Sequence, residues 1–320
     1  MSIKKFLPLI GIVILFYILI SLDKNSIIEV FSNIQPVYLA ISFIAILPIV
    51  LITNFEWQIL LRKQKIHVGN WYSIKNIFIG YFYGFITPGG FGAYVRTIYL
   101  RNQANAPLQK CVSNVLILNS IDYLSLLLIA LVGGLVYTSR FPYLFLTIGV
   151  LLILLSILFL IALKRELVIR LFKKFLDKRI IFQFGEKYHL SIEKFYDDIP
   201  KASELIYPFV ISVVGWIIRF SELYLITYLF NISIPYIYFI LGIAIANVVA
   251  SLPITIYGLG TRELTMISLF SIFLIASEKI VALSLFWFVI IWVTPSIIGG
   301  IFAFLEGPGK IKEFTFKENL

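Results

Sequence analysis

The chain has 320 residues, of which 60% are hydrophobic and only 14% are charged. Soluble domains have about 45–50% apolar and about 25% charged residues, so this composition excludes an ordinary soluble fold. The aromatic share of 16% excludes a disordered chain, and one cysteine and two histidines argue against a disulfide framework and a metal site. We therefore expect an all-α integral membrane protein with no cofactor and no metal.

Six segments are long and apolar enough to cross a bilayer as helices. They cover 6–22, 37–61, 111–138, 143–163, 205–230 and 280–305. The first follows two lysines but has no convincing small-residue cleavage site, so we interpret it as a retained helix and not as a signal peptide. Six crossings place both termini on the same side of the membrane.

Two further apolar segments, 72–102 and 236–277, are interrupted in the middle. The interruptions consist of a proline and a Gly-x-Gly unit: Pro88, Gly90 and Gly92 in the first segment, and Pro253, Gly258 and Gly260 in the second. Arms of about 12–17 residues suit a broken hairpin that enters and leaves on one side, with a pair of short full spans as the alternative. Two such hairpins entering from opposite faces predict an inverted repeat, with the substrate site between them.

The distribution of lysine and arginine predicts the orientation. If the N-terminus is cytoplasmic, the outer segments carry only Lys24, Arg140 and Lys279, whereas the inner segments carry most of the other lysines and arginines. This asymmetry predicts that both termini are cytoplasmic in a multi-pass protein of the cell membrane. It also accounts for the net charge of +10 without a nucleic acid partner.

The same pattern predicts the domain organisation. The first half of the membrane domain covers 1–163, a basic connector covers 164–203, the second half covers 204–306, and a cytoplasmic tail covers 307–320. The connector is the only sizeable polar segment and is too short for a catalytic domain. It forms either a basic amphipathic helix on the inner leaflet or a solvated connector, and the sequence leaves both open.

An arginine follows each interruption. A helix that restarts after glycines presents free N–H groups and a partial positive charge, which favour an anion, and an arginine adds a bidentate phosphate ligand. We therefore predict that a lipid phosphate is bound by Gly90, Gly92, Arg96, Gly258, Gly260 and Arg262. The alternative is that proline and glycine only shape the hairpins while the arginines extend to the headgroup region.

Ionisable side chains at membrane depth are costly, so the remaining ones are candidates for coupling or charge tuning. They are Asp122, Arg219, Glu222 and Glu263. Arg219 and Glu222 share a helix face, either as an internal ion pair or with Arg219 on the substrate path. Asp122 is either a proton-coupling carboxylate, a partner of Arg96 or Arg262, or a packing residue.

Two carboxylates have a more structural expectation. Glu263 lies in the first turn of the restarting helix, where it either balances Arg262 or serves as a ligand or proton carrier, and Thr261 before it is expected to cap that helix. Glu56 is expected to be an interfacial or packing residue.

Common enzyme signatures are absent from the sequence. It contains no Gly-Lys-Ser/Thr phosphate loop, no His-Glu-x-x-His and no Gly-x-Ser-x-Gly. We therefore expect a protein that is not an enzyme and does not use ATP itself.

The two interrupted motifs resemble the signatures of the lysylphosphatidylglycerol synthase transmembrane family. The string from Thr87 to Arg96 is similar to the first signature, and the string from Gly258 to Glu263 is similar to the second. The family includes the flippase domain of the multiple peptide resistance factor. The resemblance implies movement of a lipid between leaflets, and a stand-alone form is not expected to make lysyl-lipid.

The sequence departs from the family pattern at two places. Ala93 stands where the family commonly has a carboxylate after the first Gly-x-Gly, and Asn119, Ser120 and Ile121 precede Asp122 where an arginine is usual. These two differences leave open whether lipid movement is coupled to an ion and which lipid headgroup is selected.

Together these observations predict a flippase for an anionic phospholipid or a polyprenyl-phosphate-linked sugar. The alternative is a non-transporting partner of a glycosyltransferase or a lipid-synthesis enzyme, which would hold the lipid substrate of that enzyme. A membrane transferase with an active site at the midplane is a third interpretation, disfavoured by the lack of an acidic or histidine cluster. A homodimer and a lipid-modifying enzyme partner are both left open.

Overall fold

The computed structural model describes residues 43–168, 192–252 and 257–306, and within these residues the chain is helical with no strand. Four of the described helical stretches are long and apolar enough to cross a membrane: Leu108–Val136, Leu144–Ala162, Ala202–Phe230 and Ser277–Glu306. They correspond to four of the six predicted spans. The predicted span 6–22, the middle of the connector, Pro253 and the tail 307–320 lie outside the described residues.

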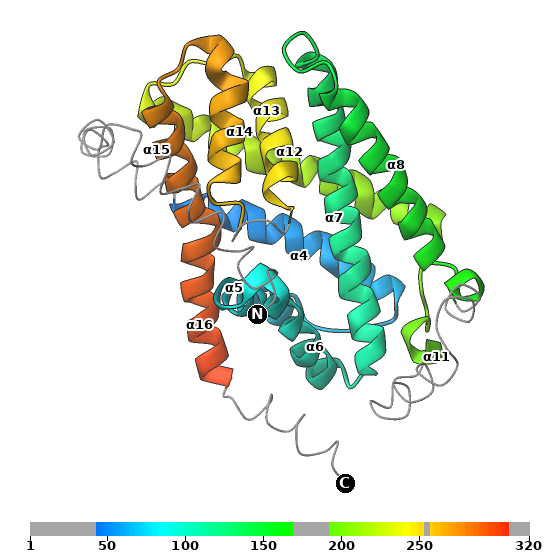
Figure 1. The fold of residues 1–320 in the computed structure, drawn as a ribbon. Helices are drawn as coiled ribbons and strands as arrows, with labels where there is room; N and C mark the ends of the chain where they lie inside the picture. Colours follow the sequence, from blue (N-terminus) through cyan, green and yellow to red (C-terminus); the bar gives the residue numbers. More distant parts are fainter. Residues whose placement is uncertain (1–42, 169–191, 253–256, 307–320) are drawn as a thin grey trace, which may run out of the picture.

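The first half consists of a helix, a helical hairpin and two long helices (Figure 1). Its elements are α4 (Ile46–Lys63), α5 (Asn70–Ile86), a 3₁₀ segment (Pro88–Val95), α6 (Arg96–Ala104), α7 (Leu108–Val136) and α8 (Leu144–Ala162). A short helix, α11 (Ile192–Phe195), follows at the end of the connector.

The second half repeats the helix and the hairpin, but one long helical stretch (Ser277–Glu306) follows the hairpin instead of two. Its elements are a 3₁₀ turn (Ala202–Leu205), α12 (Ile206–Thr227), a 3₁₀ turn (Tyr228–Phe230), α13 (Tyr236–Ala250), α14 (Thr261–Phe270), a 3₁₀ turn (Ser271–Phe273), α15 (Ser277–Phe288), a π-helical turn (Val289–Val293) and α16 (Thr294–Glu306). Both segments predicted to be broken are therefore interrupted near the predicted positions.

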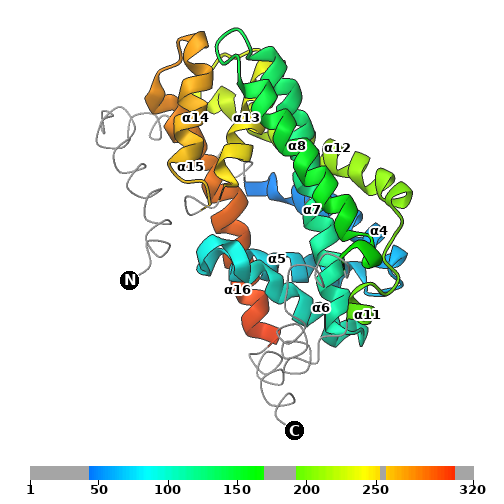
Figure 2. The same cartoon turned by 45° about the vertical axis from the view of Figure 1, so that its right-hand side comes forward.

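In each half, the helix that follows the hairpin packs on the hairpin of the other half. α7, which follows the first hairpin, packs on α13 of the second, and α16, which follows the second hairpin, packs on α5 of the first. The helices that precede the hairpins, α4 and α12, pack on each other. α13 and α14 occupy the upper part of the molecule, and α5 and α6 occupy the lower part (Figures 1 and 2). This reciprocal packing agrees with the predicted inverted repeat.

The first hairpin turns at Thr87, whose extended backbone (φ −112°, ψ 139°) ends α5. The Thr87 hydroxyl donates to the Tyr83 carbonyl (2.8 Å) and accepts the Gly92 N–H (2.7 Å). A Cβ on Gly92 would lie 2.0 Å from the Tyr83 oxygen, so only glycine lets the 3₁₀ segment pack this closely on α5.

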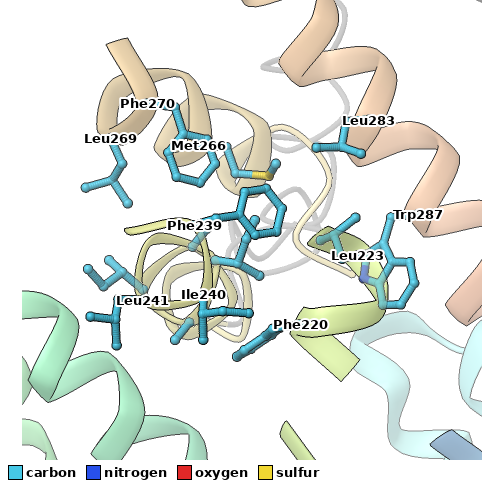
Figure 3. Close-up of a cluster of buried hydrophobic side chains, with 14 of the residues drawn as sticks. Phe220, Leu223, Phe239, Ile240, Leu241, Met266, Leu269, Phe270, Leu283 and Trp287 are labelled. Atoms are coloured by element: carbon cyan, nitrogen blue, oxygen red, sulfur yellow. The ribbon is translucent and has the colours of Figure 1, made fainter. Parts of the chain in front are cut away.

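Buried apolar side chains join the elements of the second half (Figure 3). Phe239 of α13 stacks on Phe270 of α14, with ring centroids 5.5 Å apart, and both rings are buried. In contrast, the single buried residue of α8 is Ile148, although α8 is the most hydrophobic of the four long helices. An apolar surface of this kind suits contact with lipid chains.

Three segments that the sequence places on the inner side meet at Asp198. Its carboxylate lies 2.7 Å from Lys110 Nζ and 2.6 Å from Lys65 Nζ. The adjacent acidic pair 197–198 therefore anchors the end of the connector to α7 and to the turn after α4. The side of the membrane on which this cluster lies stays a prediction.

Candidate functional site

A cavity of about 390 Å³ lies where the tips of the two hairpins meet. The first hairpin contributes Gly84, Gly90 and Ala93, and the second contributes Tyr257, whose ring stacks on Phe85 at 5.9 Å. The same cavity is lined by Asp122, the central residue of α7, so the tips lie level with the middle of that long helix. The other polar, charged and aromatic side chains of the lining, together with Ile49, are Thr53, Glu56, Tyr81, Arg96, Asn119, Trp216, Arg219, Phe220, Asn247, Trp287 and Trp292.

Arg96 begins α6 directly after the first break and reaches this cavity. It is only 9% exposed, and its guanidinium lies over the Trp57 ring at 5.4 Å. One terminal nitrogen donates to the Asn119 amide oxygen at 2.7 Å, while Nε has no hydrogen-bond partner. Among the described residues no carboxylate forms an ion pair with it. Arg96 is therefore a buried cation with a neutral partner and unused donor capacity.

Arg219 of α12 is paired across the cavity with Asp122 of α7, at 3.2 Å. Its other terminal nitrogen donates to the Thr53 hydroxyl at 2.8 Å. Asp122 also receives the Ser212 hydroxyl on its carboxylate (3.4 Å) and the Trp216 indole N–H on its backbone carbonyl (2.9 Å). The face of α12 that carries these donors thus turns Arg219 toward α7.

This arrangement differs from two of the pairings that the sequence left open. Asp122 is the partner of Arg219 and not of Arg96 or Arg262. Glu222 does not pair with Arg219 within the described part of the chain, and it does not line the cavity. Its Oε2 atom is buried without a hydrogen-bond partner.

At the second break, the charged side chains bind groups of the protein itself. The Arg262 Nε donates to the Ser284 hydroxyl (2.8 Å), and a terminal nitrogen lies 2.9 Å from Glu263 Oε1. The other Glu263 oxygen accepts the Gly260 N–H at 2.6 Å. Arg262 is 3% exposed, Glu263 is fully buried, and neither lines the cavity. Of the two roles expected for Glu263, this geometry agrees with the one in which its carboxylate neutralises the charge of Arg262.

Each break also has a glycine N–H group that is engaged inside the protein. Gly92 donates to Thr87, and Gly260 donates to Glu263. Gly260, and not Thr261, occupies the cap position of α14, and Thr261 is its first helical residue. Of the six predicted phosphate ligands, the structure places Gly90 and Arg96 on the cavity. Gly92, Gly258, Gly260 and Arg262 lie outside its lining.

Glu56 is the residue whose position the sequence interpretation missed. Expected as an interfacial or packing residue, it lines the cavity, is 2% exposed, and has an Oε1 atom without a hydrogen-bond partner. The helical spacing of the sequence could have indicated this position. The intervals of four and three place Ile49, Thr53 and Glu56 on one face of α4, and all three line the cavity.

The donors at this site suit an anion better than a metal. No group of three or more histidine, cysteine or acidic side chains that could hold a metal ion occurs among the described residues. The cavity instead offers arginine nitrogens, the Asn119 amide and a wall of Tyr81, Trp216, Tyr257 and Trp292.

Comparison with known proteins identifies the family. The chain is 28% identical over 305 residues to the UPF0104 membrane protein MJ1595 of Methanocaldococcus jannaschii, covering 88% of each chain. The family described as the lysylphosphatidylglycerol synthase TM region matches residues 8–299. With its helical membrane fold and its two broken hairpins, this chain belongs to the lysylphosphatidylglycerol synthase transmembrane family.

Proposed function

We propose that this protein moves a lipid with an anionic phosphate headgroup from one leaflet of the bilayer to the other. The observation that carries the proposal is Arg96, a buried guanidinium on the central cavity that is hydrogen-bonded to a neutral amide and retains a free Nε. A phosphate would give this guanidinium an anionic partner, which it can bind through two parallel hydrogen bonds.

The size and position of the cavity favour passage of a headgroup. A volume of about 390 Å³ lies within the usual range for small-molecule sites, about 300–1,000 Å³. It would hold a headgroup while the acyl or polyprenyl chains stay in the surrounding lipid. Its location at the level of the middle of α7 suits a site that is reached in turn from either leaflet.

The cargo is either an anionic phospholipid or a polyprenyl-phosphate-linked sugar, which share the phosphate chemistry. The alternative to transport is a protein that holds such a lipid for a membrane enzyme. Transport measured in purified form separates these, because a holding protein binds lipid but does not move it.

The test is lipid movement in proteoliposomes that contain only the purified protein. Short-chain fluorescent phosphatidylglycerol and a short-chain polyprenyl-phosphate sugar are offered separately, and the fraction that reaches the inner leaflet is measured. Wild type should move one of them, and Arg96→Ala should move neither.

The matched control is Arg140→Ala, because Arg140 is an exposed arginine in the turn between α7 and α8. This variant should transport as wild type does. A wild-type protein that retains lipid phosphate but moves neither probe would favour the holding protein and reject the flippase.

A further inference from the structure

The charged groups of the cavity are unequally paired. Asp122 and Arg219 form an ion pair, whereas Arg96 has a neutral partner and Glu56 has a carboxylate oxygen without a partner. With all four ionised, the cavity carries no net charge. An entering phosphodiester adds one negative charge, which is costly at membrane depth unless something compensates it.

Glu56 shares the cavity with charged or titratable groups from several other elements. These groups are Arg96 of α6, Arg219 of α12, Asp122 of α7, the Tyr81 phenol of α5 and the Tyr257 phenol of the second break. One Asp122 oxygen, Oδ1, accepts from both Arg219 and Ser212, and neither Asp122 oxygen is both buried and unpartnered. Glu56 therefore has the one cavity carboxylate oxygen, among the described residues, that is buried and unpartnered.

Building on the proposed function, we infer that Glu56 carries a proton together with the lipid phosphate, so that transport is an electroneutral proton–lipid symport. When the phosphate binds at Arg96, a proton from water on the same side forms an O–H bond with the Glu56 carboxylate. The loaded cavity then has no net charge. When the phosphate leaves on the other side, this O–H bond breaks and the proton passes to water there.

The test is transport of the short-chain fluorescent probe that wild type moves, phosphatidylglycerol or polyprenyl-phosphate sugar, in proteoliposomes with an imposed pH difference. Wild type should accumulate the lipid in the leaflet on the alkaline side, approaching about tenfold for each pH unit because one proton moves per lipid. A pH dye on the receiving side should report acidification when lipid enters. A potassium diffusion potential should have no effect on wild type.

Glu56→Gln imitates the protonated side chain and should keep exchanging lipid between leaflets. It should lose the response to pH, and its net transport should become sensitive to the membrane potential because an uncompensated negative charge now moves. Glu222→Gln is the matched control, since Glu222 also has a buried unpartnered oxygen but lies outside the cavity lining. It should behave as wild type.

The outcomes separate this inference from the proposed function. If wild type moves lipid but neither accumulates it under a pH difference nor acidifies the receiving side, the symport is rejected and the flippase stands. A Glu56→Gln protein that accumulates lipid as wild type does also rejects the role of Glu56. If wild type moves no lipid, both proposals fail. The dye measurement on wild type decides the coupling even if the variant does not fold.

Discussion

The two hairpin breaks start from the same pattern and end in different roles. Each has a glycine at φ 73°, Gly90 in the first and Gly258 in the second, and each is followed by a buried arginine. In the first break Arg96 opens onto the cavity, and in the second Arg262 is enclosed by Glu263 and Ser284. A carboxylate follows the arginine in the second break and none follows it in the first, so we expect the second break to be a scaffold and the first to bind a ligand.

The largest expected effect is on stability at the second break. Arg262→Ala would leave the fully buried Glu263 carboxylate without its partner, a change that costs about 3–5 kcal/mol in typical buried pairs. Thermal unfolding in detergent should show a large loss for Arg262→Ala and a much smaller one for Arg96→Ala. Equal losses would contradict the distinction between the breaks. An Arg262→Met/Glu263→Leu double variant should recover part of the stability.

A second comparison uses the two glycines with the same φ. A Cβ on Gly258 would lie 2.3 Å from the Ala250 Cβ, whereas a Cβ on Gly90 would meet nothing closer than the Tyr257 hydroxyl at 3.5 Å. Both alanine variants carry left-handed backbone strain of about 1–2 kcal/mol, and only Gly258→Ala adds a clash. Gly258→Ala should therefore unfold at a clearly lower temperature than Gly90→Ala. The reverse order would show that the second break is less tightly packed than the structure indicates.

A third effect is on transport at the first break. Arg96→Lys keeps the charge but loses the planar fork, so lipid movement should fall by about tenfold while the fold is kept. Arg96→Ala should reduce transport further. Rates in proteoliposomes, compared at equal amounts of inserted protein, measure this. A lysine variant as active as wild type would argue against bidentate phosphate binding.

The smallest effect is expected far from both breaks, at Asp198. Hydrogen bonds from Lys110 and then Lys65 hold the pKa of its carboxyl below its usual value. Since the folded pKa is the lower one, this stabilisation is complete above the unfolded pKa of about 3.9 and is lost as the pH falls through the folded pKa. Asp198→Asn should slightly lower the unfolding temperature at pH 7 and leave transport unchanged. A loss of transport would assign this cluster a functional role.

Much of the fold follows from the sequence, because hydropathy and prolines with glycines mark the spans and the breaks. The pairing inside the cavity does not follow in the same way. Arg219 and Glu222 share a helix face, yet Asp122 on another helix reaches Arg219 because Ser212 and Trp216 fix how α12 and α7 approach each other. Packing between helices distant in sequence decided that partner.

The candidate site was predicted only in part for the same reason. Arg96 could be found from its position after a Gly-x-Gly unit, and this reasoning gave Arg262 the same role. The neighbouring Glu263 was the local signal that separates the two. Glu56 could be placed only by the periodicity of α4, which requires knowing which face of that helix meets the hairpin tips.

The central claim is that Arg96 holds the phosphate of a lipid in the cavity. Native mass spectrometry of the purified protein, with the lipid that wild type transports (phosphatidylglycerol or a polyprenyl-phosphate sugar), tests this directly. Wild type and the surface variant Arg140→Gln should retain the lipid equally, and Arg96→Gln should retain at least about tenfold less at the same lipid concentration, a difference of about 1.4 kcal/mol in binding free energy. Equal retention by Arg96→Gln and wild type would contradict the claim.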